Sequence, residues 1–116
     1  MTVLSRSAST DPSVARWDPL SGPAPIEALT GRDAVVHLAG EPLGQRLTDE
    51  VKDRVRKSRV SGTRNLVEGL RATPEAERPR GLVSSSGVAY YGPRGAEEVT
   101  EEAPPGETFL AKVSLE

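Results

Sequence analysis

In the first half of the chain, hydrophobic residues gather most densely within residues 33–40. From Ala34 to Ala39 nearly every side chain is apolar, without the alternation of a half-exposed strand. This pattern is typical of a parallel strand that helices cover on both faces. The turn at Gly40 would then lie at the carboxyl end of the strand, where open α/β sheets bind their ligands. A core strand with no role beyond packing explains this stretch alone equally well.

Apolar positions at helical spacing predict one long helix that begins near Thr48 and ends before Pro74. Thr48 is a suitable N-cap, and Asp49 and Glu50 suit the positive end of the helix dipole. A glycine inside this helix, Gly62, indicates that the helix passes close to a strand or a ligand. The mixed charges of residues 49–57 predict a solvated face. The apolar face is formed by Val51, Val55, Thr63, Leu66, Val67 and Leu70.

Shorter patterns predict the remaining elements. Strands are expected within residues 1–6 and 14–19 and from Leu82 onward, a helical turn at residues 26–29, and a helix at residues 108–116. Residues 93–106 are acidic and proline-rich and predict a mobile loop. The order of strand, helix and strand indicates an α/β fold, a partial Rossmann-like doubly wound parallel sheet. Because the chain opens on a strand, an earlier strand and helix are expected to be missing. The chain also stops inside the last helix, so it is expected to be cut at both ends.

The amino-acid composition of the chain argues against several classes of function. The chain has 116 residues and a net charge of −2, which argues against general nucleic-acid binding. It has no apolar run of membrane-spanning length and no signal-peptide pattern, so a soluble, cytoplasmic chain is expected. With no cysteine and one histidine, neither a disulfide framework nor a thiolate or clustered-imidazole metal site is expected.

Three segments, in order, resemble the extended short-chain dehydrogenase/reductases. Residues 33–42 (Asp-Ala-Val-Val-His-Leu-Ala-Gly-Glu-Pro) resemble their fourth strand, and residues 58–67 (Ser-Arg-Val-Ser-Gly-Thr-Arg-Asn-Leu-Val) their central helix. Residues 84–92 (Ser-Ser-Ser-Gly-Val-Ala-Tyr-Tyr-Gly) resemble the active-site serine loop. The doubled tyrosine, the Gly-Glu-Pro and residues 17–19 (Trp-Asp-Pro) resemble the NAD(P)-binding, epimerase-like branch, of sugar nucleotide epimerase type. The resemblance implies that residues 1–116 form part of one NAD(P)-binding Rossmann domain, from its second strand to the start of the helix after the fifth.

The resemblance also implies a set of cofactor-binding residues. Ser5 and Arg6 match the end of the second strand, where such proteins hold the adenosine ribose and its 2′-phosphate, so NADP is favoured over NAD. A guanidinium there is able to hold a phosphate bidentately, although Arg6 alone is also consistent with a solvated loop cation. Arg59 matches a helix position that faces the nicotinamide half. The strand ends contribute Leu38, Ala39, Gly40 and Ser84.

The resemblance implies only part of the family's set of catalytic residues. Ser86, with Ser85 as the alternative, matches the serine that hydrogen-bonds the substrate carbonyl or hydroxyl during hydride transfer. The family's Tyr-x-x-x-Lys is absent, because Thr108 stands four residues before Lys112. Tyr91, or its neighbour Tyr90, is the candidate substitute for the missing phenol, although a ring packed under the loop is the simpler interpretation.

Two further parts of the family are absent from the sequence: the Gly-x-x-Gly-x-x-Gly turn that cradles the pyrophosphate, and the carboxyl-terminal substrate domain. One hypothesis is therefore a fragment of an NADP-dependent epimerase or reductase that acts on a nucleotide sugar or a small carbonyl or hydroxyl substrate by hydride transfer. The alternative is a non-catalytic NADP-binding or partner-binding module. In either case the isolated chain is expected to be inactive, with an exposed sheet edge that favours self-association.

Overall fold

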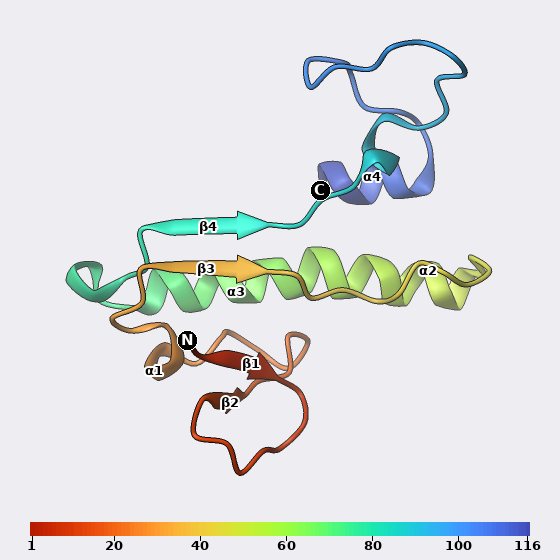
Figure 1. Cartoon of the computed structure of the whole chain (residues 1–116). Helices are drawn as coiled ribbons and strands as arrows, with labels where there is room; N and C mark the ends of the chain where they lie inside the picture. Colours follow the sequence, from red (N-terminus) through yellow and green to blue (C-terminus); the bar gives the residue numbers. More distant parts are fainter. The chain divides into compact units, whose positions relative to one another are not determined.

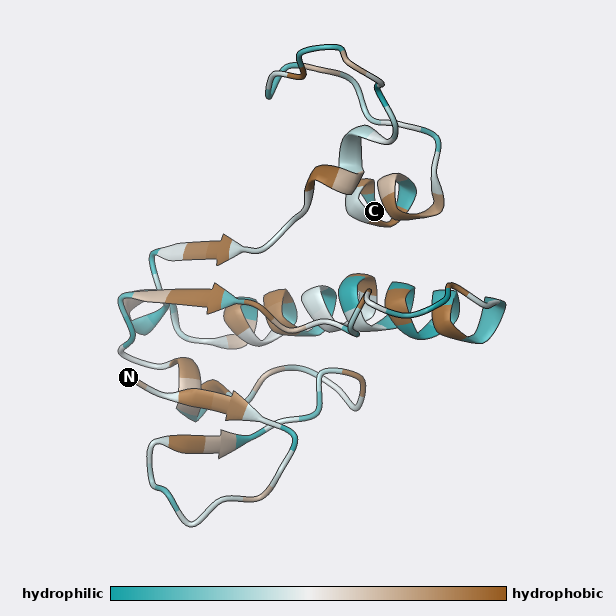
Figure 2. Cartoon of the chain, turned by 45° about the vertical axis from the view of Figure 1, so that its right-hand side comes forward, coloured by the Kyte–Doolittle hydropathy of each residue, from teal (hydrophilic) through white to brown (hydrophobic).

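Four short parallel strands form the framework of the first of two units, Met1–Ser84. Strand β1 (Val3–Ser5) pairs with β2 (Val14–Arg16), and β3 (Ala34–His37) pairs with β4 (Gly81–Ser84). The two pairs are not hydrogen-bonded to each other, so every strand keeps one unpaired edge. Strands β1 and β3 point the same way in both views, which brings their carboxyl ends to one edge of the unit (Figures 1 and 2). The computed structural model describes all residues, 1–116.

The predicted long helix is present and contains a segment that the sequence did not predict. It consists of α2 (Asp49–Arg56), a π-helical segment η1 (Lys57–Ser61) and α3 (Gly62–Ala72). Thr48 is the N-cap, as predicted, and its hydroxyl accepts a hydrogen bond from the backbone N–H of Val51 at 3.4 Å. A short 3-10 helix, η2 (Glu75–Glu77), follows Pro74 and leads to β4.

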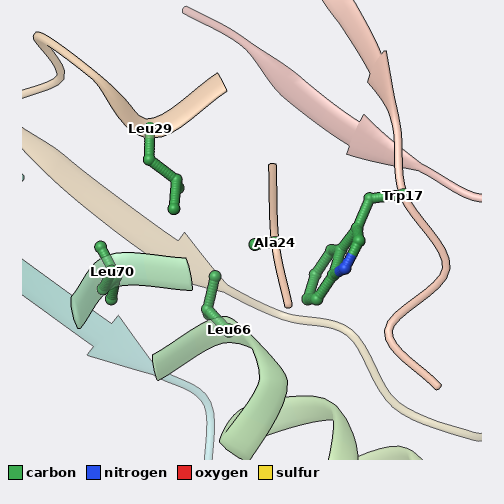
Figure 3. Packing of buried hydrophobic residues seen from close by; sticks show 5 residues of the cluster. All are labelled: Trp17, Ala24, Leu29, Leu66 and Leu70. Atoms are coloured by element: carbon green, nitrogen blue, oxygen red, sulfur yellow. The ribbon is translucent and has the colours of Figure 1, made fainter. Parts of the chain in front are cut away.

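The core of this unit lies between the long helix, the strands and α1 (Ile26–Leu29). Its members are buried side chains from α1, from α3 and from the segments after β2, with Leu4 and Val35 packed against them from the strands. The indole N–H of Trp17 donates to the carbonyl of Gly22 at 3.0 Å, so the ring is both buried and fixed in orientation. Figure 3 shows the cluster, which consists of Trp17, Ala24, Leu29, Leu66 and Leu70.

Two helical glycines mark the places where the segment after β2 approaches the helix. A Cβ on Gly62 would lie 3.3 Å from Cβ of Pro19, and a Cβ on Gly69 would lie 2.5 Å from the carbonyl oxygen of Ala24. The backbone N–H of Ala24 donates to the carbonyl of Asn65 at 3.1 Å, which ties the two segments together. The helix does make a close approach at Gly62, but the element that approaches is the loop at Pro19, whereas a strand or a ligand was predicted.

The expectation that β3 is covered on both faces is wrong for this chain. Val35 and His37 face the long helix, whereas Val36 is 63% exposed and its partner in register, Val83, is 61% exposed. The reason is that the long helix covers only one face of this strand pair. The apolar colour along β3 and β4 in Figure 2 therefore includes side chains on an open face.

The second unit, Ser85–Glu116, contains a 3-10 helix, η3 (Val88–Tyr91), and α4 (Phe109–Leu115). Thr108 caps α4 and accepts from the backbone N–H of Ala111 at 3.2 Å. Between them, residues 93–106 form no helix or strand, as predicted. Arg94 fastens this loop by donating to the carbonyls of Tyr91 and Pro104. No helix of the chain has both the length and the apolar character needed to cross a bilayer.

Candidate functional site

The carboxyl ends of β1 and β3 present the residues that were predicted to bind a cofactor. Ser5 ends β1, and its hydroxyl accepts from the backbone N–H of Ser7 at 3.2 Å, which turns the chain directly after the strand. Arg6 follows at the surface, and its side chain has no hydrogen bond or ion pair. Leu38, Ala39 and Gly40 follow β3 and are exposed, Leu38 by 75%. Ser84, also exposed, ends β4.

The loop after β3 is held in place by two side chains of the π-helical segment. The backbone N–H of Glu41 donates to the hydroxyl of Ser58 at 2.9 Å, and Nη1 of Arg59 donates to the carbonyl of Glu41 at 3.0 Å. Ser58 in turn donates to the carbonyl of Val55 at 3.0 Å. Segments with π-helical geometry are rare in proteins, and those that do occur often lie at functional sites.

Gly40 lies where the Arg59 guanidinium packs closely against this loop. A Cβ on Gly40 would be 3.2 Å from the guanidinium carbon and from Nη1 of Arg59. The structure therefore places Arg59 on the loop backbone, at the end of β3. The prediction that Arg59 also faces the nicotinamide half of a cofactor is not tested by these contacts and stays a prediction.

The side chain of Glu41 is occupied by two partners. Its Oε1 lies 3.2 Å from Nε of Arg54 and 3.3 Å from Nε2 of Gln45. The hydrogen bond from Arg54 lowers the pKa of Glu41 most, and that from Gln45 adds to it. The positive charges of Arg54 and of Arg6 lower this pKa further, so Arg6 lies within electrostatic reach of Glu41.

His37 lies beneath this edge of the sheet rather than on its surface. Only 7% of the residue is exposed, and Nε2 lies 3.1 Å from the hydroxyl of Thr63 on α3. Burial lowers the pKa of His37, because an imidazolium there would lose its hydration. The histidine therefore joins β3 to the long helix as a neutral ring, and no group of three or more His, Asp or Glu side chains has a metal-binding arrangement.

The candidate catalytic residues belong to the second unit. An open hollow of about 430 Å³ is lined there by Ser86, Gly87, Val88, Tyr90, Tyr91 and Ser114. The two tyrosine rings meet edge to face, with centroids 5.0 Å apart. Ser85 does not line the hollow, and its hydroxyl lies 3.5 Å from the carbonyl of Ser86. The structure thus brings Ser86 and Tyr91 to one hollow and leaves Ser85 outside it.

Sequence reasoning missed the residues that position the loop after β3. Ser58 lies inside a motif segment, but its partner, the backbone N–H of Glu41, is seventeen positions away. Arg54 belongs to the run of charges that predicts a solvated face, and that face does carry the ion pairs Lys52–Asp49 and Lys57–Asp53. No local signal distinguishes Arg54 from these neighbours, because its partner comes from the preceding loop.

No protein-family model matches the chain. Individual proteins do match it. An epimerase family protein of Arabidopsis thaliana, an SDR39U1 homolog described as chloroplastic, is 37% identical over 88 residues, which cover 76% of this chain and 25% of that protein. The epimerase family protein MT2273 of Mycobacterium tuberculosis is 33% identical over 112 residues, covering 96% of this chain and 36% of that protein. The chain thus spans about a quarter to a third of the length of these relatives.

The chain is also similar to solved structures of epimerases. The human epimerase family protein SDR39U1, crystallised with NADPH, matches 97% of this chain and 37% of its own, with a TM-score of 0.75 and 32% identity. A nucleoside-diphosphate sugar epimerase from Corynebacterium glutamicum matches 95% of this chain and 22% of its own, with a TM-score of 0.75 and 38% identity. The predicted Rossmann-like fold class is confirmed. By sequence and by fold, the chain is homologous to part of the epimerase family proteins, in the NAD(P)-binding, epimerase-like group of the extended short-chain dehydrogenase/reductases.

Proposed function

We propose that the first unit supplies the adenosine end of an NADP(H) site, with Arg6 as the ligand of the 2′-phosphate. The observation that carries this proposal is the free guanidinium of Arg6, exposed directly after β1 at the edge where the strands end. A guanidinium without a protein partner is able to give both of its parallel N–H groups to a phosphate. The NADPH bound to the human relative supports the choice of cofactor.

The other predicted cofactor residues fit this arrangement. Ser5 lies beside Arg6 at the turn, and the exposed residues Leu38 to Gly40 follow the end of β3. Arg59 and Ser58 fix the position of that backbone through Glu41. A rigid loop loses less conformational freedom when it binds, so this bracing favours affinity.

Titration of NADPH and of NADH into the chain, followed by nicotinamide fluorescence, tests the proposal. NADPH is expected to bind more tightly than NADH, and Arg6→Ala is expected to weaken NADPH binding by about 10-fold or more, since hydrogen bonds to charged groups contribute about 1.5–3 kcal/mol. The control variant is Arg32→Ala, which removes an exposed arginine away from the strand ends. Equal affinities for the two cofactors, or no binding of either, would contradict the proposal.

For the complete protein, we propose hydride transfer between NADP(H) and a nucleotide sugar or a small carbonyl or hydroxyl substrate. Ser86 is the favoured hydrogen-bond donor to the substrate, and Tyr91 the favoured proton-transfer group, because both line the hollow of the second unit. Ser85 is the weaker candidate, since it lies outside that hollow. The relative named as a nucleoside-diphosphate sugar epimerase supports the substrate class.

A second candidate function is cofactor binding without catalysis. The missing Tyr-x-x-x-Lys favours it, because Thr108 has no ionisable group to offer at the place of the tyrosine. The discriminating experiment compares the wild-type protein with Ser86→Ala and Tyr91→Phe for oxidation of NADPH with nucleotide sugars and small carbonyl compounds. Turnover that either variant abolishes supports the enzyme, and NADPH binding with no turnover supports the non-catalytic module.

Three further predictions complete the proposal. Residues 1–116 are proposed to act as part of one NAD(P)-binding domain. The unpaired strand edges are proposed to cause self-association of the isolated chain, because free N–H and C=O groups accept a further strand. A cytoplasmic location also stays a prediction, and one relative is described as chloroplastic.

A further inference from the structure

Arg6 is an unpaired cation with a carboxylate nearby. It follows β1, and Glu41 lies in the loop after β3, whose carboxyl end is at the same edge of the first unit (Figures 1 and 2). The charge of Arg6 acts on Glu41, yet no ion pair joins them. An exposed arginine and a neighbouring glutamate usually attract each other, so their separation needs a physical reason.

The reason lies in how Glu41 is held. Its backbone is held on both sides of the Cα, by Ser58 at the N–H and by Arg59 at the carbonyl. Its side chain is only 26% exposed, and its carboxylate is engaged through Oε1 by Arg54 and Gln45. Gln45 is itself anchored, because Nε2 also donates to the carbonyl of Pro42 at 2.8 Å.

We propose that Arg54 is a specificity-determining residue that acts through Glu41: by holding the carboxylate on the α2 side, it keeps Arg6 free to bind the 2′-phosphate of NADP. This inference rests on the proposed NADP(H) site. Without Arg54, the Glu41 carboxylate would turn toward Arg6 and compete with the phosphate for the same guanidinium. NADH carries no phosphate at this position, so its binding would not sense the competition.

The test measures the ratio of NADPH affinity to NADH affinity in three variants of the chain. Arg54→Ala is expected to lower this ratio by about two- to fivefold, the range that an exposed ion pair contributes. Adding Glu41→Gln to Arg54→Ala is expected to restore the ratio, because the competing charge is then absent. Lys52→Ala is the matched control, since it removes a cation from the same helix whose partner is Asp49.

The double variant separates two explanations. If Arg54 attracted the phosphate directly, its loss would lower the ratio whether or not Glu41 is charged. A ratio that Arg54→Ala leaves unchanged, or that the double variant does not restore, would overturn this inference while leaving the proposed NADP(H) site in place. A wild-type chain that binds both cofactors equally well would overturn the proposed site and this inference together.

A cofactor-free measurement gives a second readout. Carboxyl NMR titration of Glu41 reports its pKa with and without Arg6. In the wild-type chain, Arg6→Ala is expected to raise this pKa only slightly, because the hydrogen bond from Arg54 is the main cause of its lowering. In the Arg54→Ala background the same substitution is expected to raise it more. An equal effect of Arg6→Ala in both backgrounds would show that Glu41 does not turn toward Arg6, and would overturn the inference.

Discussion

Substitution of Gly69 by alanine sets helix propensity against tertiary packing. Gly69 lies inside α3, where alanine is favoured over glycine by up to about 1 kcal/mol. Judged from the sequence alone, Gly69→Ala should therefore stabilise the chain. The structure predicts the opposite, because the added Cβ would lie 2.5 Å from the carbonyl oxygen of Ala24 and 2.9 Å from its Cβ and its nitrogen.

The size of the effect follows from these contacts. The helix and the Ala24 segment must separate by several tenths of an ångström or more, and overpacking of this kind costs about 1–3 kcal/mol. Separation also weakens the hydrogen bond from Ala24 N–H to Asn65, whose loss costs about 0.5–1.5 kcal/mol. After the gain in helix propensity is subtracted, the free energy of unfolding should fall by about 1–3 kcal/mol.

Urea unfolding followed by tryptophan fluorescence measures this difference. Trp17 is the only tryptophan and belongs to the same cluster as Ala24, so its emission reports on the part of the core that the substitution disturbs. Gly44→Ala is the matched control, because a Cβ there would meet no atom within 4 Å. A Gly69→Ala chain as stable as the wild type, or more stable, would refute the close packing of Ala24 on α3.

Three further outcomes are expected. Because burial lowers the pKa of His37, the unfolded chain takes up a proton at this residue at a higher pH than the folded chain does, so the free energy of unfolding should be constant above about pH 6.5 and fall below it. His37→Gln should remove this fall. Urea midpoints of the wild type that are the same at pH 7.5 and at pH 5.5 would contradict the buried neutral ring. Thr48→Ala should cost about 0.5–1 kcal/mol, because the long capping bond contributes little, whereas Thr48→Ser should cost less. Ser58→Ala should speed hydrogen exchange of the Glu41 amide while Ser61→Ala does not, and equal exchange rates in the two variants would argue against the loop bracing.

The sequence predicts those parts of the fold that depend on local rules. The apolar run before Gly40 identifies β3, and Thr48 with its acidic neighbours marks the start of the long helix, because capping is decided within one turn. The π-helical segment is not predictable in this way. Residues 57–61 carry no pattern that distinguishes them from an α-helical turn, although Ser58 and Arg59 of this segment contact the loop after β3.

The sequence proposes residues for the candidate site but does not predict how their neighbours are arranged. Ser5 and Arg6 are candidates because they match the end of a family strand, and Tyr91 because it stands in the segment that resembles the serine loop; their roles stay predictions. The pairing of Arg54 with Glu41 depends on how the loop after β3 returns past α2, which no spacing encodes. The open face of β3 is missed for a similar reason: an apolar run indicates burial, but it does not say which element covers each face.

The central claim, that the strand ends of the first unit bind NADP(H) through Arg6, is tested most directly by amide and guanidinium NMR of the labelled chain during NADPH addition. The account predicts that the largest shifts occur at Ser5, Arg6 and Leu38 to Gly40, and that the Arg6 Nε–H signal moves with NADPH but not with NADH. Shifts confined to the hollow of the second unit, or an Arg6 signal that responds equally to both cofactors, would contradict it.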